Sequence, residues 1–138
     1  QEIFIQAQAK GPLTEQAYLH ALDKDHLLAR LQGIDAVMTE HTLDALVAPT
    51  EGPPSLIDLV KGDPSGGGSF SSPAAVAGYP HVTVPMGYVC GLPVGLSFVG
   101  RPWSEGPLIK FAFAYEQATK ARRPPRFAAT AELPPARA

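Results

Sequence analysis

The sequence contains a single cysteine and no long hydrophobic run. Cys90 cannot form a disulfide within the chain, which excludes a disulfide scaffold. No stretch approaches the ~18–20 apolar residues that a membrane-spanning helix needs. The N-terminus lacks the basic and apolar segments of a secretory signal peptide. We therefore expect a soluble, cytoplasmic protein with no membrane partner.

An excess of positive charge is also missing. The formal net charge is −2 at pH 7 and the sequence pI is about 6.1. Proteins that bind nucleic acid concentrate positive charge, so this balance argues against a nucleic-acid partner. Of the 138 residues, 45% are hydrophobic and 17% are charged. This composition predicts one folded domain with a buried core, spanning residues 1–138.

Glycine and proline are abundant, with 13 and 15 residues, and they predict many turns and short elements. In the first half of the chain, a helix is expected from Thr14 as N-cap to about residue 32, with Gly33 as a left-handed stop. A short helix over 35–42 and a buried strand over 43–48 follow. The segment 50–71, rich in Gly, Pro and Ser, is predicted to be a loop of the kind that is often functional.

The second half of the chain is expected to begin with a short helix that has Ser72 as N-cap and ends at Gly78. Strands are predicted over 81–88 and 92–99, joined by a hairpin turn over 89–91. A last helix is expected after Ser104. Its apolar stripe, which we expect to face the core, consists of Leu108, Phe111, Ala112, Tyr115 and Ala118. Residues 122–138 are expected to form an extended tail.

This order of elements predicts an α/β fold with a small mixed sheet flanked by helices. A strand–helix–strand unit is usually a right-handed parallel crossover. The strand that starts at Leu43 is therefore expected to run parallel to the strand that starts at His81. The strand that starts at Leu92 is expected to pair antiparallel beside the latter.

The segment from Gly66 to Ser72 offers the most obvious catalytic pattern. A serine on a glycine-rich loop can act as a nucleophile, with His81 as a possible base. A loop that ends in a helix cap explains the same residues more simply, since neither a Gly-x-Ser-x-Gly elbow nor a phosphate-binding loop is present. Glu40, His41 and Asp44 could bind a metal, but a turn before a strand explains them equally well. The residues alone therefore predict no catalytic set, no metal site and no cofactor.

Three linked motifs carry a resemblance to a known family. They are the runs from Leu43 to Thr50, from Ser72 to Gly87 and from Gly91 to Gly100, with a helix from Leu13 to Leu31 before them and one from Leu108 to Thr119 after them. In this order they resemble the C-terminal part of amidase signature family enzymes, over residues 10–127. The resemblance implies a C-terminal piece of a larger α/β enzyme.

Members of that family hydrolyse amide bonds, or transfer ammonia from them, with a Ser–cisSer–Lys triad and no cofactor. The triad lies in the part of the family's sequence that precedes the matched region, and Lys10 and Lys24 occur here in other contexts. The resemblance therefore implies no catalytic residue in this chain, no activity of the chain alone, and a small-molecule amide as substrate of the whole enzyme. The alternative is a non-catalytic structural or interaction module derived from the same fold.

Ser69 and Phe70 lie in the family segment that runs near the substrate pocket. The resemblance makes them candidates for the rim of that pocket. The alternative is that these two residues only fix the conformation of the chain before the helix that begins near Pro73.

A detached piece of a larger fold is expected to expose apolar surface. The runs 43–48 and 94–99 are apolar enough to be buried on both faces, and Leu19 and Leu27 lie off the main stripe of the first helix. Exposed apolar patches and unpaired strand edges are typical of interfaces. We therefore expect a homo-oligomer, or docking to the missing N-terminal part.

Overall fold

The computed structural model describes residues 1–55, 57–60, 62 and 68–127. Its helices are α1 (Glu2–Gln8), α2 (Gln16–His26), the π-helix η1 (Leu27–Ile34), α3 (Asp35–Glu40), α4 (Ser71–Ala77) and α5 (Glu105–Thr119). Its strands are β1 (Leu46–Pro49), β2 (His81–Val89) and β3 (Leu92–Val99). Gly66, Gly67 and the tail beyond residue 127 lie outside the described residues. No helix among the described residues is long and apolar enough to cross a membrane.

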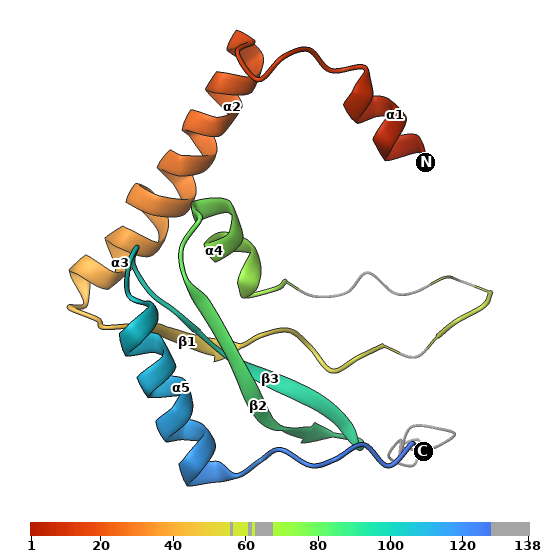
Figure 1. Ribbon diagram of the computed structural model, residues 1–138, viewed down its shortest axis with the longest axis vertical. Coiled ribbons are helices and arrows are strands. Elements are labelled where there is room, and N and C mark those ends of the chain that lie inside the picture. Colours follow the sequence, from red (N-terminus) through yellow and green to blue (C-terminus); the bar gives the residue numbers. More distant parts are fainter. Residues whose placement is uncertain (56, 61, 63–67, 128–138) are drawn as a thin grey trace, which may run out of the picture.

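The three strands form one small sheet, with helices packed on both of its faces (Figure 1). The predicted α/β fold with a small sheet flanked by helices is therefore confirmed. The prediction of a mixed sheet is wrong, because the strand order is β1–β3–β2 and β3 pairs antiparallel with both neighbours, so the described sheet is antiparallel throughout. β1 and β2 do point in the same direction, as predicted. They do not pair, since the tight hairpin after β2 inserts β3 between them.

The hairpin between β2 and β3 is tighter than predicted. Cys90 and Gly91 alone form the turn, with φ values of 52° and 77°. Positive φ at both central residues is the pattern of a type I′ turn, whose twist matches that of paired strands. The register shifts between Pro85 and Gly87. Proline has no N–H to donate to the ladder, so a bulge is expected at this position.

The core has two parts, one on each face of the sheet. On one face, Val99 packs with buried residues of the helices before and after β1: Ile34, Met38, Ala74 and Ala77. On the other face, Phe98 packs with Leu108 and Ala112 of α5. Phe98 also meets Tyr115 edge to face, with ring centroids 6.3 Å apart. Neighbouring residues of β3 therefore point into different halves of the core, as strand alternation requires.

β1 is an edge strand and is less buried than its sequence predicts. Val47 is 52% exposed and Leu43 is 39% exposed, so the expectation that 43–48 is buried on both faces is wrong. The end of β3, from Ser97 to Val99, is buried as expected. The difference follows from position, because a central strand is covered by two neighbours and an edge strand by one.

The first long helix does not stop at Gly33. This residue has φ −104° and ψ −105°, outside the left-handed region, and the chain continues through a kink into α3. A Cβ at this position would lie 2.6 Å from the Leu28 carbonyl oxygen. Glycine is required here by a close backbone approach, so the predicted cap is wrong. The predicted N-cap is also displaced, because Glu15 rather than Thr14 precedes α2.

The two later helices match their predictions more closely. α4 ends at Gly78, which has φ 67°, but Phe70 rather than Ser72 occupies its N-cap position. Ser104 is the N-cap residue of α5, although its hydroxyl donates to the Arg101 carbonyl at 2.6 Å and makes no capping bond. The predicted stripe of α5 faces the sheet, except for Ala118, which is exposed.

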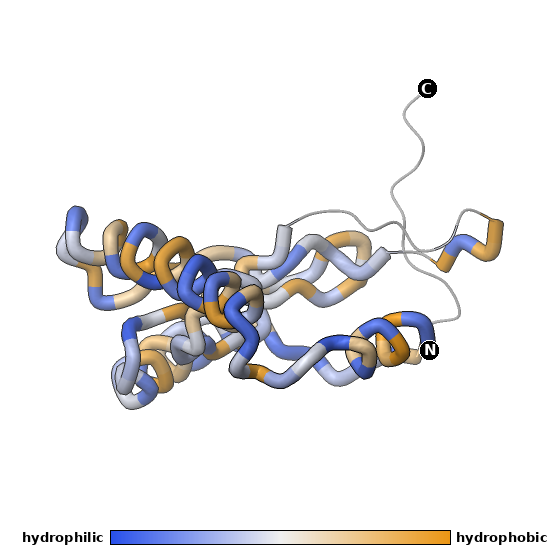
Figure 2. Tube along the Cα trace, turned by 90° about the horizontal axis from the view of Figure 1, so that it is seen from above, coloured by the Kyte–Doolittle hydropathy of each residue, from blue (hydrophilic) through white to orange (hydrophobic). Residues whose placement is uncertain are grey.

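Residues 1–26, which we call the arm, differ from residues 34–127, which we call the body. α1 and α2 contain no buried residue. Figure 1 shows α2 extending away from the sheet and α1 lying apart from the helices of the body. Along the arm, hydrophobic and hydrophilic residues follow each other closely (Figure 2). The arm therefore carries apolar side chains that the body leaves at least partly exposed.

Candidate functional site

Three hydroxyl side chains form a row across the sheet. Ser97 Oγ in β3 lies 2.7 Å from Thr50 Oγ1, directly after β1, and 3.1 Å from Thr83 Oγ1 in β2. Ser97 is fully buried. No buried polar side-chain atom among the described residues lacks a hydrogen-bond partner. This hydroxyl row is therefore a satisfied polar network and contains no unpaired nucleophile.

Strand register and one glycine bring the hydroxyl row together. Thr83 lies directly opposite Ser97 in the β2–β3 ladder. The Thr50 N–H donates to the Gly95 carbonyl at 2.8 Å. A Cβ on Gly95 would lie 2.7 Å from both Thr50 Oγ1 and Thr83 Cγ2. Glycine at position 95 therefore makes this close approach possible. One sequence signal was available, because Ser97 interrupts the apolar run 94–99.

The two candidate rim residues lie beside Thr50. The Phe70 N–H donates to the Thr50 carbonyl at 3.0 Å, and the Phe70 side chain packs partly buried against the core. Ser69 Oγ accepts a hydrogen bond from the Ser71 N–H at 3.3 Å and shares a second one with Ser71 Oγ at 2.5 Å. The structure thus joins Ser69 and Phe70 to the start of α4 and to the sheet at Thr50.

His81 does not join these serines. Its Nε2 lies 3.5 Å from Thr83 Oγ1, and no hydrogen bond within the described part of the chain links it to Ser69 or Ser71. The described residues also contain no group of three or more His, Cys, Asp or Glu side chains that could hold a metal ion. The serine–histidine pair considered from the sequence is therefore not formed among them.

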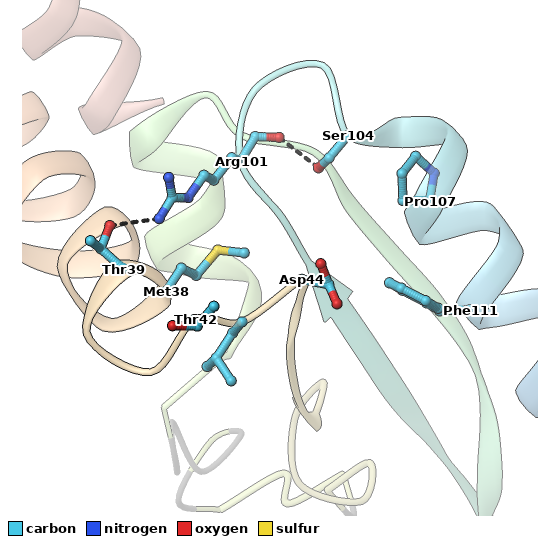
Figure 3. A pocket seen from close by; sticks show the side chains of 9 residues that line it. Met38, Thr39, Thr42, Asp44, Arg101, Ser104, Pro107 and Phe111 are labelled. Atoms are coloured by element: carbon cyan, nitrogen blue, oxygen red, sulfur yellow. Dashed lines mark hydrogen bonds between the residues drawn. The ribbon is translucent and has the colours of Figure 1, made fainter.

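A hollow of about 550 Å³ lies at the opposite end of β1, between α3 and α5. Figure 3 shows the Asp44 carboxylate and the Phe111 ring facing the same space. The side chains that line it are Met38, Thr39, Thr42, Leu43, Asp44, Arg101, Ser104, Pro107 and Phe111. Sequence reasoning did not find this hollow, because residues far apart in the chain form it and no local motif connects them.

Arg101 connects two walls of the hollow. Its Nη2 donates to Thr39 Oγ1 at 2.6 Å and to the Asp35 carbonyl at 3.5 Å (Figure 3). The guanidinium therefore ties the turn after β3 to α3. Trp103, in the same turn, has φ 66° and is 92% exposed. The described hydrogen bonds of Arg101 therefore join two segments of the fold.

A tyrosine near this end of the molecule has a perturbed pKa. Tyr79 Oη donates to Asp35 Oδ2 at 2.7 Å, and the Arg30 guanidinium lies 5.8 Å from its ring centroid. Burial, then the hydrogen bond to Asp35 and its negative charge, raise the pKa of Tyr79, against the opposing charges of Arg30 and Arg101. The phenol therefore stays protonated and donates at neutral pH. It links α3 to the corner before β2.

Comparison with known proteins gives a consistent result. No protein-family model matches the chain. A probable amidase from Arabidopsis thaliana is 39% identical over 130 residues, which cover 94% of this chain and 22% of that protein. The native peptide amidase from Stenotrophomonas maltophilia superposes with a TM-score of 0.80 at 50% identity, over 92% of this chain and 25% of that chain. The chain belongs to the amidase signature family.

A more distant relative gives the same fold. An amidase family protein from Bacillus anthracis superposes with a TM-score of 0.66 at 31% identity, over 89% of this chain and 21% of that chain. The chain therefore spans about a quarter or less of the length of these amidase signature relatives. The site described above is part of an amidase fold whose larger portion lies outside this chain.

Proposed function

We propose that this chain is the C-terminal portion of an amide hydrolase that cleaves C–N bonds when the whole fold is assembled. The observation that carries the proposal is the match itself. Half of the matched residues are identical to a solved peptide amidase, and the match includes 92% of this chain. The substrate class we assign to the whole enzyme is a small amide, and the similarity to a peptide amidase favours a peptide amide.

We also propose that the chain is inactive alone. Its serines near the sheet bond to each other or to hydroxyls, and their described partners include no lysine. Lys10 and Lys24 both lie on the exposed arm. A serine nucleophile needs a base within hydrogen-bond reach. The Ser–cisSer–Lys triad of the family would then be supplied by the larger portion of the fold.

Within the assembled enzyme, we assign Ser69 and Phe70 to the rim of the substrate pocket. Support comes from their anchoring to Thr50 by the Phe70–Thr50 hydrogen bond of 3.0 Å. That bond holds the two residues at the end of β1, away from the hollow near Arg101. Self-association and a cytoplasmic location remain predictions from the sequence.

The test uses a chimera in which this chain replaces the matching quarter of the Stenotrophomonas maltophilia peptide amidase. We expect the chimera to hydrolyse a peptide amide and the isolated chain to show no turnover. In the chimera, Phe70→Ala is expected to raise KM more than it lowers kcat, because a rim residue contacts bound substrate. Val76→Ala, at an exposed position of α4, is the matched control.

Two results would contradict the proposal. A chimera that folds but does not hydrolyse a peptide amide would contradict the assignment of this chain to an amide hydrolase. Turnover by the isolated chain that disappears in Ser69→Ala, Ser71→Ala or Ser72→Ala would show that the chain carries its own nucleophile.

A further inference from the structure

The hollow between α3 and α5 has the size and the lining of a small-molecule site. Its volume of about 550 Å³ lies within the range of roughly 300–1,000 Å³ that is typical of ligand pockets. Apolar side chains form much of its wall, including the buried Met38 and the half-buried Phe111. A few polar groups set in an apolar wall are the usual composition of such a pocket. The hollow therefore has room for a small organic molecule with an apolar part.

Two of the nine side chains that line the hollow are charged, and their charges are opposite. Asp44 lies shortly before β1, and Arg101 lies in the turn after β3. Figure 3 shows the Asp44 carboxylate on the side of Phe111 and the Arg101 guanidinium beside Thr39. Within the described part of the chain, no ion pair joins the two charges and the Asp44 carboxylate accepts no hydrogen bond. The carboxylate is therefore available to a positively charged group of a ligand.

Arg101 also retains donors for a ligand. Its two described hydrogen bonds, to Thr39 Oγ1 and to the Asp35 carbonyl, both come from Nη2. A guanidinium has five N–H donors, which lie on Nε, Nη1 and Nη2. Among the residues that the structure describes, none accepts a hydrogen bond from Nε or Nη1. Arg101 is therefore held in place through one nitrogen and can bind a carboxylate through the others.

A strained residue lies at the edge of the hollow. Thr42 has φ 51°, a left-handed conformation that is rare for a β-branched residue. It follows the end of α3, where the Leu43 N–H donates to the Met38 carbonyl at 2.9 Å. Glycine is the usual residue at such a helix end, because it has no Cβ. Strained backbone of this kind is frequent at ligand sites, and Thr42 lines the hollow, so its conformation supports a binding role.

We infer that the hollow binds the zwitterion of an amino acid with an apolar side chain. The ammonium group of the ligand meets the Asp44 carboxylate, and its carboxylate accepts hydrogen bonds from Nε and Nη1 of Arg101. Its apolar side chain packs against Phe111. β1 separates this site from the candidate rim residues, because Asp44 precedes β1 and Thr50 follows it. The inference uses residues of this chain alone and is independent of the proposed function.

The test titrates the isotope-labelled chain with L-phenylalanine and follows the amide signals by NMR. We expect saturable shifts at Asp44 and Arg101 with a roughly millimolar dissociation constant, as suits about a dozen ligand atoms in an open hollow. L-phenylalaninamide lacks the carboxylate and phenylpropionate lacks the ammonium group, so each should bind about 10-fold more weakly. Asp44→Asn should also weaken the binding of phenylalanine about 10-fold.

The matched control is Asp25→Asn, which removes the same charge from an exposed position of the arm and should leave the binding unchanged. Unshifted amide signals of β2 and β3 show that each variant is folded. The same titration is repeated with the chimera of this chain and the Stenotrophomonas maltophilia peptide amidase. We expect the chimera to bind phenylalanine with a similar dissociation constant.

Four results would overturn the inference. The first is an absence of saturable binding to the isolated chain. The second is equal affinity for phenylalanine and either analogue, because one of the two charges would then not be recognised. The third is binding that Asp44→Asn leaves unchanged, which would place the ligand elsewhere. The fourth is binding that a folded chimera loses, because the larger portion of the fold would then fill the hollow. None of these measurements involves amide hydrolysis, so they remain decisive even if the proposed function fails.

Discussion

The arm and the body contain apolar side chains of the same kinds in very different surroundings. Ile34 and Leu108 in the body are 4% and 0% exposed, whereas Ile3 and Phe4 in the arm are each 78% exposed. The body has a sheet with helices on both faces, so Ile34 and Leu108 find apolar partners within the chain. The two helices of the arm, α1 and α2, contain no buried residue. The comparison shows that an apolar sequence pattern predicts burial without specifying the molecule that provides it.

The largest expected effect tests the body. Leu108→Ala removes a fully buried side chain that packs against Phe98, and it should lower the free energy of unfolding by about 2–5 kcal/mol. Urea denaturation of the isolated chain measures this loss. Ile109→Ala, one residue along the same helix and 59% exposed, should change stability by less than about 0.5 kcal/mol. Equal losses in both variants would mean that α5 does not pack as described.

A smaller effect is expected at the hydroxyl row. Gly95→Ala places a Cβ 2.7 Å from Thr50 Oγ1 and should lower the free energy of unfolding by about 1–3 kcal/mol through overpacking. Gly106→Ala is the control, since its Cβ would meet nothing within 4 Å and alanine favours a helix. The control should be neutral or stabilising. A neutral Gly95→Ala would show that β3 can move away from Thr50 without cost.

Tyr79→Phe should lower the free energy of unfolding by about 1 kcal/mol at neutral pH, because it removes the hydrogen bond to Asp35. The pKa of Tyr79 is raised in the folded state. The stabilisation from this bond is therefore complete below the ordinary tyrosine pKa of about 10 and is lost as pH rises through the folded value. Denaturation between pH 8 and about 11 should show a wild-type decline that Tyr79→Phe lacks. Parallel pH profiles would exclude Tyr79 as the cause.

The smallest effect is expected in the arm. Phe4→Ser in the isolated chain should change the free energy of unfolding by less than about 0.5 kcal/mol, because the 78% exposed ring has little packing to lose. Urea denaturation again provides the measurement. A loss above about 1 kcal/mol would mean that the isolated chain covers α1 in solution.

Local patterns predicted much of the body. Cys90 and Gly91 suit a hairpin turn, Gly78 suits a helix end, and the spacing of Leu108 and Ala112 indicates one face of a helix. Each of these features depends on neighbours within about four residues. The strand order could not be predicted in the same way, since antiparallel pairing of β3 with β1 joins residues such as Val99 and Leu46, which are more than a third of the chain apart.

The candidate site was less predictable than the fold. The family resemblance indicated Ser69 and Phe70, but their hydrogen bonds to Ser71 and Thr50 depend on tertiary structure. Gly33 illustrates the limit of residue preference. A glycine after an amphipathic helix predicts that the helix ends there. In the structure, Gly33 instead lies at a kink, where the close approach of the Leu28 carbonyl leaves no room for a Cβ.

Trp103 is the chain's single tryptophan, and its side chain is 92% exposed in the turn after β3. Water therefore surrounds the indole in the folded protein as well as in the unfolded one, and the emission maximum should be similar in both states. The emission of Trp103 should therefore change little when the body unfolds, although tryptophan emission is commonly used to follow unfolding. A blue shift would instead mark the moment at which another surface covers this turn. The residue is a built-in optical probe of assembly.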